Sequence, residues 1–385
     1  MGTGCESLLA RGPRAGANRL AGLDAARGMA MLLVCLSHFG HLYLGLLGLE
    51  EAEEGMSRLT LAATPAFVLV SGLVLGFLHS TRREEKAFRE LRRRLLDRAL
   101  FLLTVAHLLI VGAHLPKFGF PVALDFVFIT DVVAVCVVVG TAVVPTVRAR
   151  SRIARGGALY VAATLLALVW MPAPGSIPQL AKHLLVGHSP TLEQSMFVYN
   201  FPILQWLVLY LVATTLGETL TQRRAENGAP EAVALAGLGV ALMGSGAVLR
   251  VLRPALHHLP TLGSRAAFLT SSSQKLPLGP AFLLCYSGLA LCLVAGCLWL
   301  CRVSPGTLVA RAFGLVGRNS TVGPPAATAW AERLTRGPRT QAPGSADPGW
   351  DIPRAVAPAR AADRSGFRSV ARGAGRGERV LSFAR

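Results

Sequence analysis

Residues 23–38 read LDAARGMAMLLVCLSH. Asp24 and Arg27 precede an apolar helix, and His38 follows Arg27 after ten intervening residues, with His41 one turn further on. An α-helix rises about 1.5 Å per residue, which places His38 roughly 16 Å beyond Arg27 along the helix axis. If this helix spans a bilayer, His38 lies near mid-depth, where ionisable side chains are costly and indicate a functional site.

The composition is that of a membrane protein. Hydrophobic residues make up 52% of the 385 residues and charged residues only 16%, and the mean hydropathy is +0.49. A soluble domain carries about 25% charged residues, so this chain lacks the polar surface of a soluble globule. The net charge of +18 is spread between apolar runs and the C-terminal part, without a basic stripe interleaved with aromatics. We therefore expect the lipid bilayer as a partner and no nucleic acid.

Eight apolar segments are long enough to approach or cross a hydrocarbon core of about 30 Å. They predict an all-α polytopic membrane protein with about eight transmembrane helices. The first segment lies too far from the N-terminus and is too long for a cleaved signal peptide. The segments are Gly28–Leu49, Leu59–Leu78, Ala99–Leu115, Val122–Val147, Gly157–Met171, Met196–Gly217, Ala232–Leu249 and Pro280–Cys301.

Basic residues predict the orientation of the chain. They are frequent before the first segment and after each even-numbered one, whereas the connection after the first segment is acidic, with Glu50, Glu51, Glu53 and Glu54. The positive-inside rule then places the N-terminus in the cytoplasm, in a multi-pass protein of the plasma membrane. The connection after the seventh segment, which carries Arg250, Arg253, Arg265 and Lys275, is an exception to this pattern.

The chain divides into three predicted parts, a cytoplasmic leader (residues 1–18), a membrane domain (19–320) and an Arg/Pro/Gly/Ala-rich tail (321–385). The hydrophobic pattern ends at Ser320, and no lysine occurs in the 65 residues that follow. Such a segment cannot bury enough apolar surface to offset the entropy of ordering, so we expect it to be disordered. An ordinary basic tail is one interpretation. We favour a frame-shift product, because these amino acids have GC-rich codons, and the membrane domain would then continue hydrophobically.

The sequence shows no metal-binding pattern. The seven cysteines are scattered, without a CxxC pair or a Cys/His cluster, and are predicted to be small buried apolar residues. The glycine pairs at 237/239 and 244/246 lie within an apolar segment, so close helix packing explains them better than a phosphate loop. Gly72 and Gly76 carry the same packing signal.

Four motifs resemble those of integral-membrane acyltransferases. They are RLAGLDAARGMA at 19–30 followed by His38, PAFVLVSG at 65–72, RRRLLDR at 92–98 and FGLVGRNS at 313–320. The chain is similar in them to the acyltransferase-3 group and to the related heparan-alpha-glucosaminide N-acetyltransferase and glucan-modifying OpgC-like proteins. The arginine, ten residues and histidine from Arg27 to His38 match the first-helix motif of the acyltransferase-3 group. Members of these families usually have ten or more spans, so this chain departs from the pattern by lacking the last ones.

The resemblance implies acyl transfer from a thioester to a hydroxyl or amine. His38 is the expected catalytic residue, either as the base that deprotonates the acceptor or as a transient acyl carrier. His41 lies on nearly the same helix face and is a lesser candidate. Arg27 would orient the site or contact the donor, and Asp24 would pair with it; the alternative is a plain ion pair at the start of the helix.

Donor binding is expected at the basic stretch that precedes the third segment. Arg93, Arg94 and Arg98 could hold the phosphates of acyl-CoA, with acetyl-CoA as the expected donor, through bidentate guanidinium contacts. Positive-inside anchoring would explain the same arginines. The expected acceptor is a cell-envelope carbohydrate or lipid.

Other polar residues in apolar surroundings complete the candidates. Asp125 and Asp131 of the fourth segment could line a tunnel, and Ser71, Asn200 and Gln205 are lesser candidates. A different function class, a transporter or flippase that uses intramembrane His and Asp residues, stays open, as does an inactive, truncated family member. A cytoplasmic arginine cluster favours the acyltransferase, since a transporter needs no anion site there.

Overall fold

The computed structural model describes residues 21–82, 85–118, 126–188, 199–226, 231–258, 263–271, 278–303 and 308–319. All of them belong to one compact unit, residues 1–332. The predicted leader and tail, Ser320 and Asp125 lie outside the described residues, as do the side chains of His41 and Asn200.

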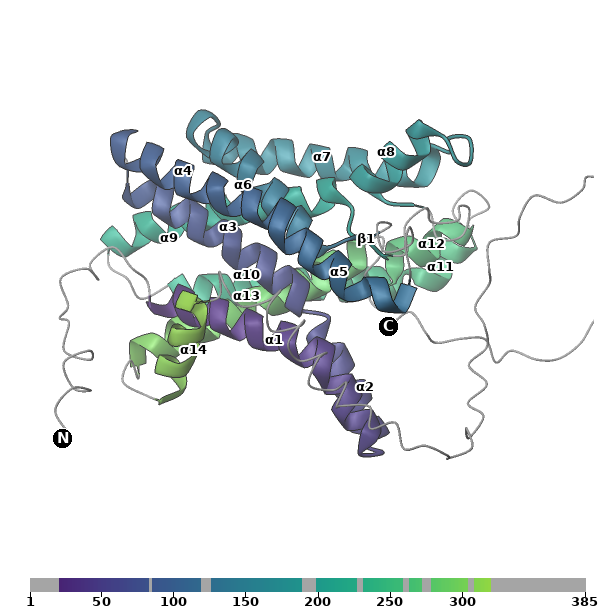
Figure 1. Cartoon of the computed structure of the whole chain (residues 1–385), viewed down its shortest axis with the longest axis horizontal. Coiled ribbons are helices and arrows are strands. Elements are labelled where there is room, and N and C mark those ends of the chain that lie inside the picture. The colour runs from purple at the N-terminus through teal and green to yellow at the C-terminus, as the bar shows by residue number, and fades with distance from the viewer. Residues whose placement is uncertain are drawn as a thin grey trace, which may run out of the picture. The chain divides into compact units, whose positions relative to one another are not determined.

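The described part of the chain is almost entirely helical (Figure 1). Its helices are α1 (Ala21–Leu46), α2 (Glu50–Thr60), α3 (Ala63–Thr81), α4 (Glu85–Phe101), the π-helical turn η2 (Leu102–Ala106), α5 (His107–Phe118), α6 (Ile129–Thr146), α7 (Ala149–Val169), α8 (Ile177–Val186), α9 (Ile203–Glu226), α10 (Glu231–Val251), α11 (Arg253–His257), α12 (Gly263–Thr270), α13 (Pro280–Val303) and α14 (Leu308–Asn319). Two short strands, β1 (Phe126–Val127) and β2 (Tyr199–Asn200), pair in parallel just before α6 and α9.

Seven helical stretches are long and apolar enough to cross a membrane, which confirms a polytopic all-α protein. They correspond to the second through eighth predicted segments and are Glu51–Thr81, Lys86–Pro116, Ile129–Thr146, Ala149–Val169, Ile203–Gln222, Glu231–Val251 and Pro280–Val303. The first predicted segment forms the 26-residue helix α1, about 39 Å long at 1.5 Å per residue. It is not among the seven stretches found within the described residues, and its first turns carry Asp24 and Arg27.

Two predicted segments begin later than expected. The fourth was placed from Val122 and the sixth from Met196, but their helices start at Ile129 and Ile203. In both cases the strand pair β1–β2 precedes the helix, and runs of apolar residues do not distinguish such a strand from the first turn of a helix.

Helix α3 lies at the centre of the unit and packs against α1, α6, α9 and α13. Its contact with α9 depends on Gly72 and Gly76, where a Cβ atom would collide with the backbone carbonyls of Tyr210 and Thr214. Small residues allow the backbones of membrane helices to approach closely, so the predicted packing role of these glycines is confirmed. On α10, the second glycine of each predicted pair, Gly239 and Gly246, packs against α13 in the same way.

The peripheral helices expose apolar side chains. Examples on α7 are Val161, Leu165, Leu166 and Val169, and examples on α10 are Val233, Val240 and Val248. Bands of this kind on helices long enough to span a bilayer fit contact with lipid tails. The positions of α7 and α10 therefore agree with a bundle embedded in a membrane.

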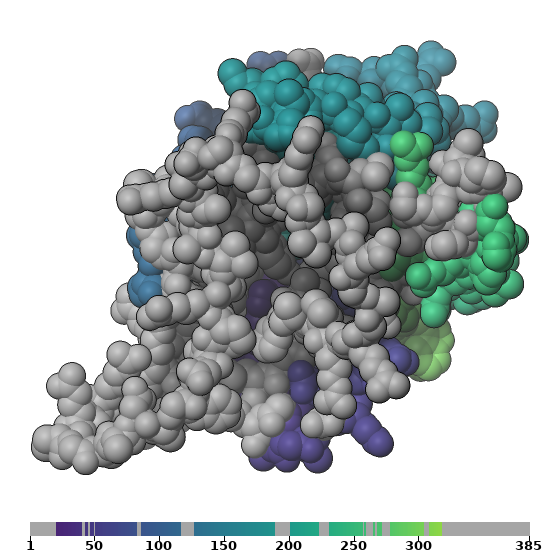
Figure 2. Space-filling model, turned by 90° about the vertical axis from the view of Figure 1, so that its right-hand side faces the viewer, coloured from purple at the N-terminus to yellow at the C-terminus, as the bar shows by residue number. Residues whose placement is uncertain are grey.

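The connections after the odd-numbered segments gather on one face. Figure 2 shows α2, the end of α5, α8 and the α11–α12 segment around this face. These elements follow the first, third, fifth and seventh predicted segments, as an alternating path through a bilayer requires. The gathering of these elements on one face fits a chain that crosses a bilayer back and forth.

Candidate active site

The predicted catalytic motif lies on α1, against α14. Gly28 and Gly317 bring the two helices into backbone contact, because a Cβ at Gly28 would meet the carbonyl of Phe313 and one at Gly317 would meet the carbonyl of Asp24. Asp24 and Arg27 are half-buried next to this contact. The first and the last of the four motifs therefore meet in space, although Asp24 and Phe313 are 289 residues apart in the sequence.

His38 lies further along α1 and its side chain is exposed. The turn before it is regular helix, in which the Ser37 hydroxyl donates a hydrogen bond to the carbonyl of Val34 at 2.7 Å. About three turns of α1 separate His38 from Arg27, a rise of about 16 Å, as the sequence predicted from helix geometry. The structure thus places His38 and Arg27 on the same helix but too far apart to contact the same small group.

The arginines expected to bind the donor are exposed on α4. Arg93, Arg94 and Arg98 all point away from the protein interior, and Arg94 pairs with Glu90 one turn earlier. Arg94 and Arg98 are four residues apart and share a helix face, whereas Arg93 lies about 100° around the helix from Arg94. Their guanidinium groups are available to an anionic ligand in water, although the geometry fits membrane anchoring equally well.

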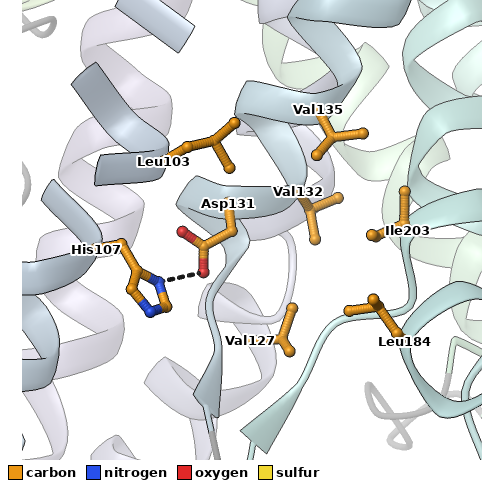
Figure 3. A pocket seen from close by; sticks show the side chains of 8 residues that line it. All are labelled: Leu103, His107, Val127, Asp131, Val132, Val135, Leu184 and Ile203. Atoms are coloured by element: carbon orange, nitrogen blue, oxygen red, sulfur yellow. Dashed lines mark hydrogen bonds and ion pairs between the residues drawn. The ribbon is translucent and has the colours of Figure 1, made fainter. Parts of the chain in front are cut away.

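A cavity of about 260 Å³ lies where η2, α5, α6, α8 and α9 meet (Figure 3). Two of its lining residues, His107 and Asp131, are polar, and the others are aliphatic: Leu103, Val127, Val132, Val135, Leu184 and Ile203. We refer to this space as the His107 cavity. Figure 3 shows the imidazole of His107 turned toward the carboxylate of Asp131, with Leu184 and Ile203 on the far wall.

The polar edge of the His107 cavity is a hydrogen-bonded pair. Asp131 Oδ2 lies 2.9 Å from His107 Nδ1 and also accepts a hydrogen bond of 2.9 Å from the backbone N–H of Phe128. The latter contact caps the start of α6, where a negative charge is favourable. Asp131 Oδ1 is buried and has no hydrogen-bond partner among the described residues. A carboxylate that orients an imidazole in this way is the arrangement that general bases use.

Local backbone geometry places His107 at this point. It follows η2 directly, so a π-helical turn interrupts the long helix from Lys86 to Pro116 just before the imidazole. Such turns shift the register of the side chains that follow and are frequent at functional sites. The Phe128 ring lies beside both His107 and His114, with centroid distances of 5.8 and 5.6 Å.

A second His–carboxylate pair joins α3, α7 and α9 at the other end of the bundle. His79 Nδ1 lies 3.0 Å from Glu218 Oε1, and Arg152 donates to Glu218 Oε2 and, at 2.8 Å, to Thr214 Oγ1. The Arg152 residue is only 2% exposed, so these contacts form in the protein interior. We call His79, Arg152, Thr214 and Glu218 the Arg152 cluster.

The sequence did not single out most of these residues. Asp131 and Gln205 were named as candidates, but His107, His79 and Glu218 were not, and Arg152 was counted only among the basic residues of a connection. The available signal was the presence of His and Glu inside apolar helices, which predicts intramembrane partners without identifying them. Ser71 donates back to the carbonyl of Phe67 at 2.7 Å, within the predicted second-helix motif.

Buried polar groups continue from the His107 cavity along α8. Lys182 and His183 are fully buried, and the Lys182 ammonium lies 3.9 Å from Met171 Sδ. Gln205 donates from Nε2 to the carbonyl of Val186 at 2.9 Å. Within the described ranges, no group of three or more His, Cys, Asp or Glu side chains is placed to hold a metal ion.

Comparison with protein families identifies the family of this chain. A family model described as an acyltransferase domain, of the acyltransferase-3 type, matches residues 20–322, which is more than half of the chain. The chain belongs to this acyltransferase family. Neither the curated proteins nor the solved structures give a significant match to it.

Membership in the acyltransferase family agrees with the resemblance in the four motifs, all of which lie in the matched region apart from Arg19. The family assignment, together with the apolar helices, makes this chain a multi-pass membrane protein of acyltransferase type. It favours an acyltransferase over the transporter or flippase interpretation.

Proposed function

We propose that this acyltransferase moves an acyl group, with acetyl as the expected one, from acyl-CoA in the cytoplasm to a carbohydrate or lipid of the cell envelope. The observation that carries the proposal is the family match over residues 20–322, which includes the helix with Arg27 and His38. The orientation rests on the basic connections, which put the N-terminus and the start of α4 on the cytoplasmic side of the plasma membrane.

His38 is the proposed base. The acceptor oxygen attacks the thioester carbonyl while the imidazole of His38 takes the hydroxyl proton. The carbon–sulfur bond then breaks, and the CoA thiolate leaves and regains a proton from the imidazolium. In the alternative sequence, His38 Nε2 or Nδ1 attacks first and carries the acyl group as an acyl-imidazole, which the acceptor then cleaves.

Asp24 and Arg27 are proposed to act at the cytoplasmic start of the same helix. Their backbone is held by the glycine contact with α14, which fixes where both side chains leave the helix. A guanidinium about 16 Å from His38 is at a distance suited to the polar part of an extended donor rather than to the thioester carbon. Arg93, Arg94 and Arg98 on α4 would add further phosphate contacts to CoA.

The proposal is tested with the purified full chain in lipid vesicles. Acetyl-CoA labelled in the acetyl group is supplied with an extract of envelope lipids and glycans, and transfer of the label to either fraction is measured. We expect label in one fraction when the donor is present on the side that carries α4, and none with the donor on the other side alone. Absence of transfer from acetyl-CoA and from longer acyl-CoA thioesters would overturn the proposal.

A further inference from the structure

The His107 cavity offers a ligand one hydrogen-bond acceptor. Asp131 Oδ2 already accepts from the Phe128 N–H and faces His107 Nδ1 at 2.9 Å, which assigns a charged carboxylate and the Nδ1–H tautomer of the imidazole. In that tautomer His107 Nε2 carries a lone pair, and it makes no hydrogen bond within the described part of the chain. Asp131 Oδ1 also lacks a partner among the described residues, but it is fully buried and out of reach of a ligand. A matching ligand must therefore supply a hydrogen-bond donor to His107.

The walls of the cavity determine which kind of molecule can carry this hydrogen-bond donor. Six of the eight lining side chains are aliphatic, from Leu103 on one side to Leu184 and Ile203 on the other. A sugar ring would bring several hydroxyls against these walls without partners, and each buried unpaired hydroxyl costs about 1–3 kcal/mol on the scale of protein mutations. A thioester supplies only acceptors and does not match the polar edge. An alcohol with an apolar body satisfies both conditions.

We propose that the His107 cavity binds the hydroxyl end of a lipid alcohol, with His107 Nε2 as its hydrogen-bond acceptor and Asp131 holding the imidazole in place. Six of its eight lining residues lie on helical stretches long and apolar enough to cross a bilayer, which brings the site close to lipid. Its role as the acceptor site rests on the acyl transfer proposed above, and it narrows the acceptor from carbohydrate or lipid to a hydroxyl carried on an apolar chain. The binding itself does not depend on that reaction.

The test places a thiol in the cavity wall opposite the polar edge. Leu184→Cys is introduced into the full chain in detergent, and the rate at which N-ethylmaleimide alkylates the new thiol is measured by peptide mass spectrometry. Two probes are compared, octanol and octyl methyl ether, which share an apolar chain but differ in the hydroxyl donor. The native thiol of Cys285 on α13 is followed in the same samples as an internal control for effects of the probes on the detergent.

We expect octanol to slow alkylation at about a tenfold lower concentration than the ether, which is the size of effect that one hydrogen bond provides. This ratio should fall to near one when Asp131→Ala removes the group that holds the imidazole, and also with His107→Phe, which keeps an aromatic ring and removes both nitrogens. Two substitutions are used because either variant alone could fail to give a monodisperse protein on gel filtration. The other variant then still completes the test. Equal protection by both probes, or a ratio unchanged by the substitutions, would overturn the proposal.

The outcome separates this inference from the proposed function, because the alkylation assay needs no acyl transfer. If the transfer assay fails while octanol protects selectively, the alcohol site stands and its role as acceptor site is lost. If transfer succeeds and no selective protection is found, the acceptor binds elsewhere and this inference is wrong.

Discussion

The two His–carboxylate pairs have the same chemistry and opposite surroundings. In the Arg152 cluster, Glu218 receives His79 on one oxygen and Arg152 on the other, and Arg152 is buried. In the His107 cavity, Asp131 pairs with His107 through one oxygen only, and both residues line a space of about 260 Å³.

Both pairs consist of a histidine and a carboxylate, so their surroundings, and not their residue types, give one pair a structural role and the other a functional role. A buried carboxylate with its charge compensated on both oxygens holds α3, α7 and α9 together. A carboxylate that pairs with an imidazole beside an apolar cavity holds the imidazole in place and leaves its second nitrogen as an acceptor for a ligand. The first pair should thus respond to substitution in stability, and the second in binding and turnover.

Arg152→Met should give the largest loss of stability. It leaves Glu218 in the interior with its charge partly uncompensated, and removal of one partner from a buried ion pair costs about 3–5 kcal/mol. The midpoint of thermal unfolding in detergent should fall well below that of wild type, whereas Arg155→Met, an exposed position on the same helix, should leave it unchanged. A wild-type midpoint for Arg152→Met would mean that the Arg152 cluster does not hold the helices together.

Gly76→Ala should give the next largest loss of stability. Its new methyl group would collide with the Thr214 carbonyl, next to the Arg152 cluster, and forced overpacking costs about 1–3 kcal/mol. The matched control is Gly244→Ala on α10, where a Cβ meets open space and the better helix propensity should add about 0.5–1 kcal/mol. Opposite signs of the two changes in unfolding free energy are expected, and equal signs would contradict the assigned α3–α9 contact.

His107→Phe should have a small effect on stability and a large one on activity. Asp131 keeps its hydrogen bond from the Phe128 N–H and lies at the edge of a cavity, so the free energy of unfolding should fall by less than in Arg152→Met. The KM for the acceptor should rise at least tenfold, while the KM for acyl-CoA stays the same. His79→Phe is the control from the other pair, and it should lower stability without raising the KM of folded enzyme. The reverse pattern would exchange the roles of the two pairs.

Arg94→Gln with Arg98→Gln should have the smallest effect on stability. Exposed ion pairs such as that of Arg94 with Glu90 contribute about 0–1 kcal/mol, so the unfolding midpoint should not move measurably. If these arginines contact CoA phosphates, the KM for acyl-CoA should rise several-fold and the rise should shrink at high salt. Arg150→Gln, exposed on α7, is the control. An unchanged KM would leave the α4 arginines with an anchoring role alone.

The sequence predicted the helices better than their contacts. Long apolar runs set seven of the helical spans, and glycines such as Gly72 and Gly76 indicated where helices approach closely. The partner of Asp131 could not be predicted, because His107 is 24 residues away and reaches it only through a π-helical turn. Arg152 belongs to the basic connection after the fourth predicted segment, which indicates a cytoplasmic boundary but not a buried ion pair, and packing against Glu218 buries it. Tertiary contacts of this kind have no periodic signal in the sequence.

The central claim, that His38 carries out acyl transfer, is tested most directly by the initial rate of the His38→Gln variant in the vesicle assay with labelled acetyl-CoA. Glutamine keeps a polar side chain of similar reach but cannot accept the proton or carry the acyl group. The account predicts a rate about 10²- to 10⁴-fold below wild type, with an unchanged unfolding midpoint and full activity in the control Tyr43→Phe on the same helix. A wild-type rate for His38→Gln would contradict the claim and move the search for the base to His107.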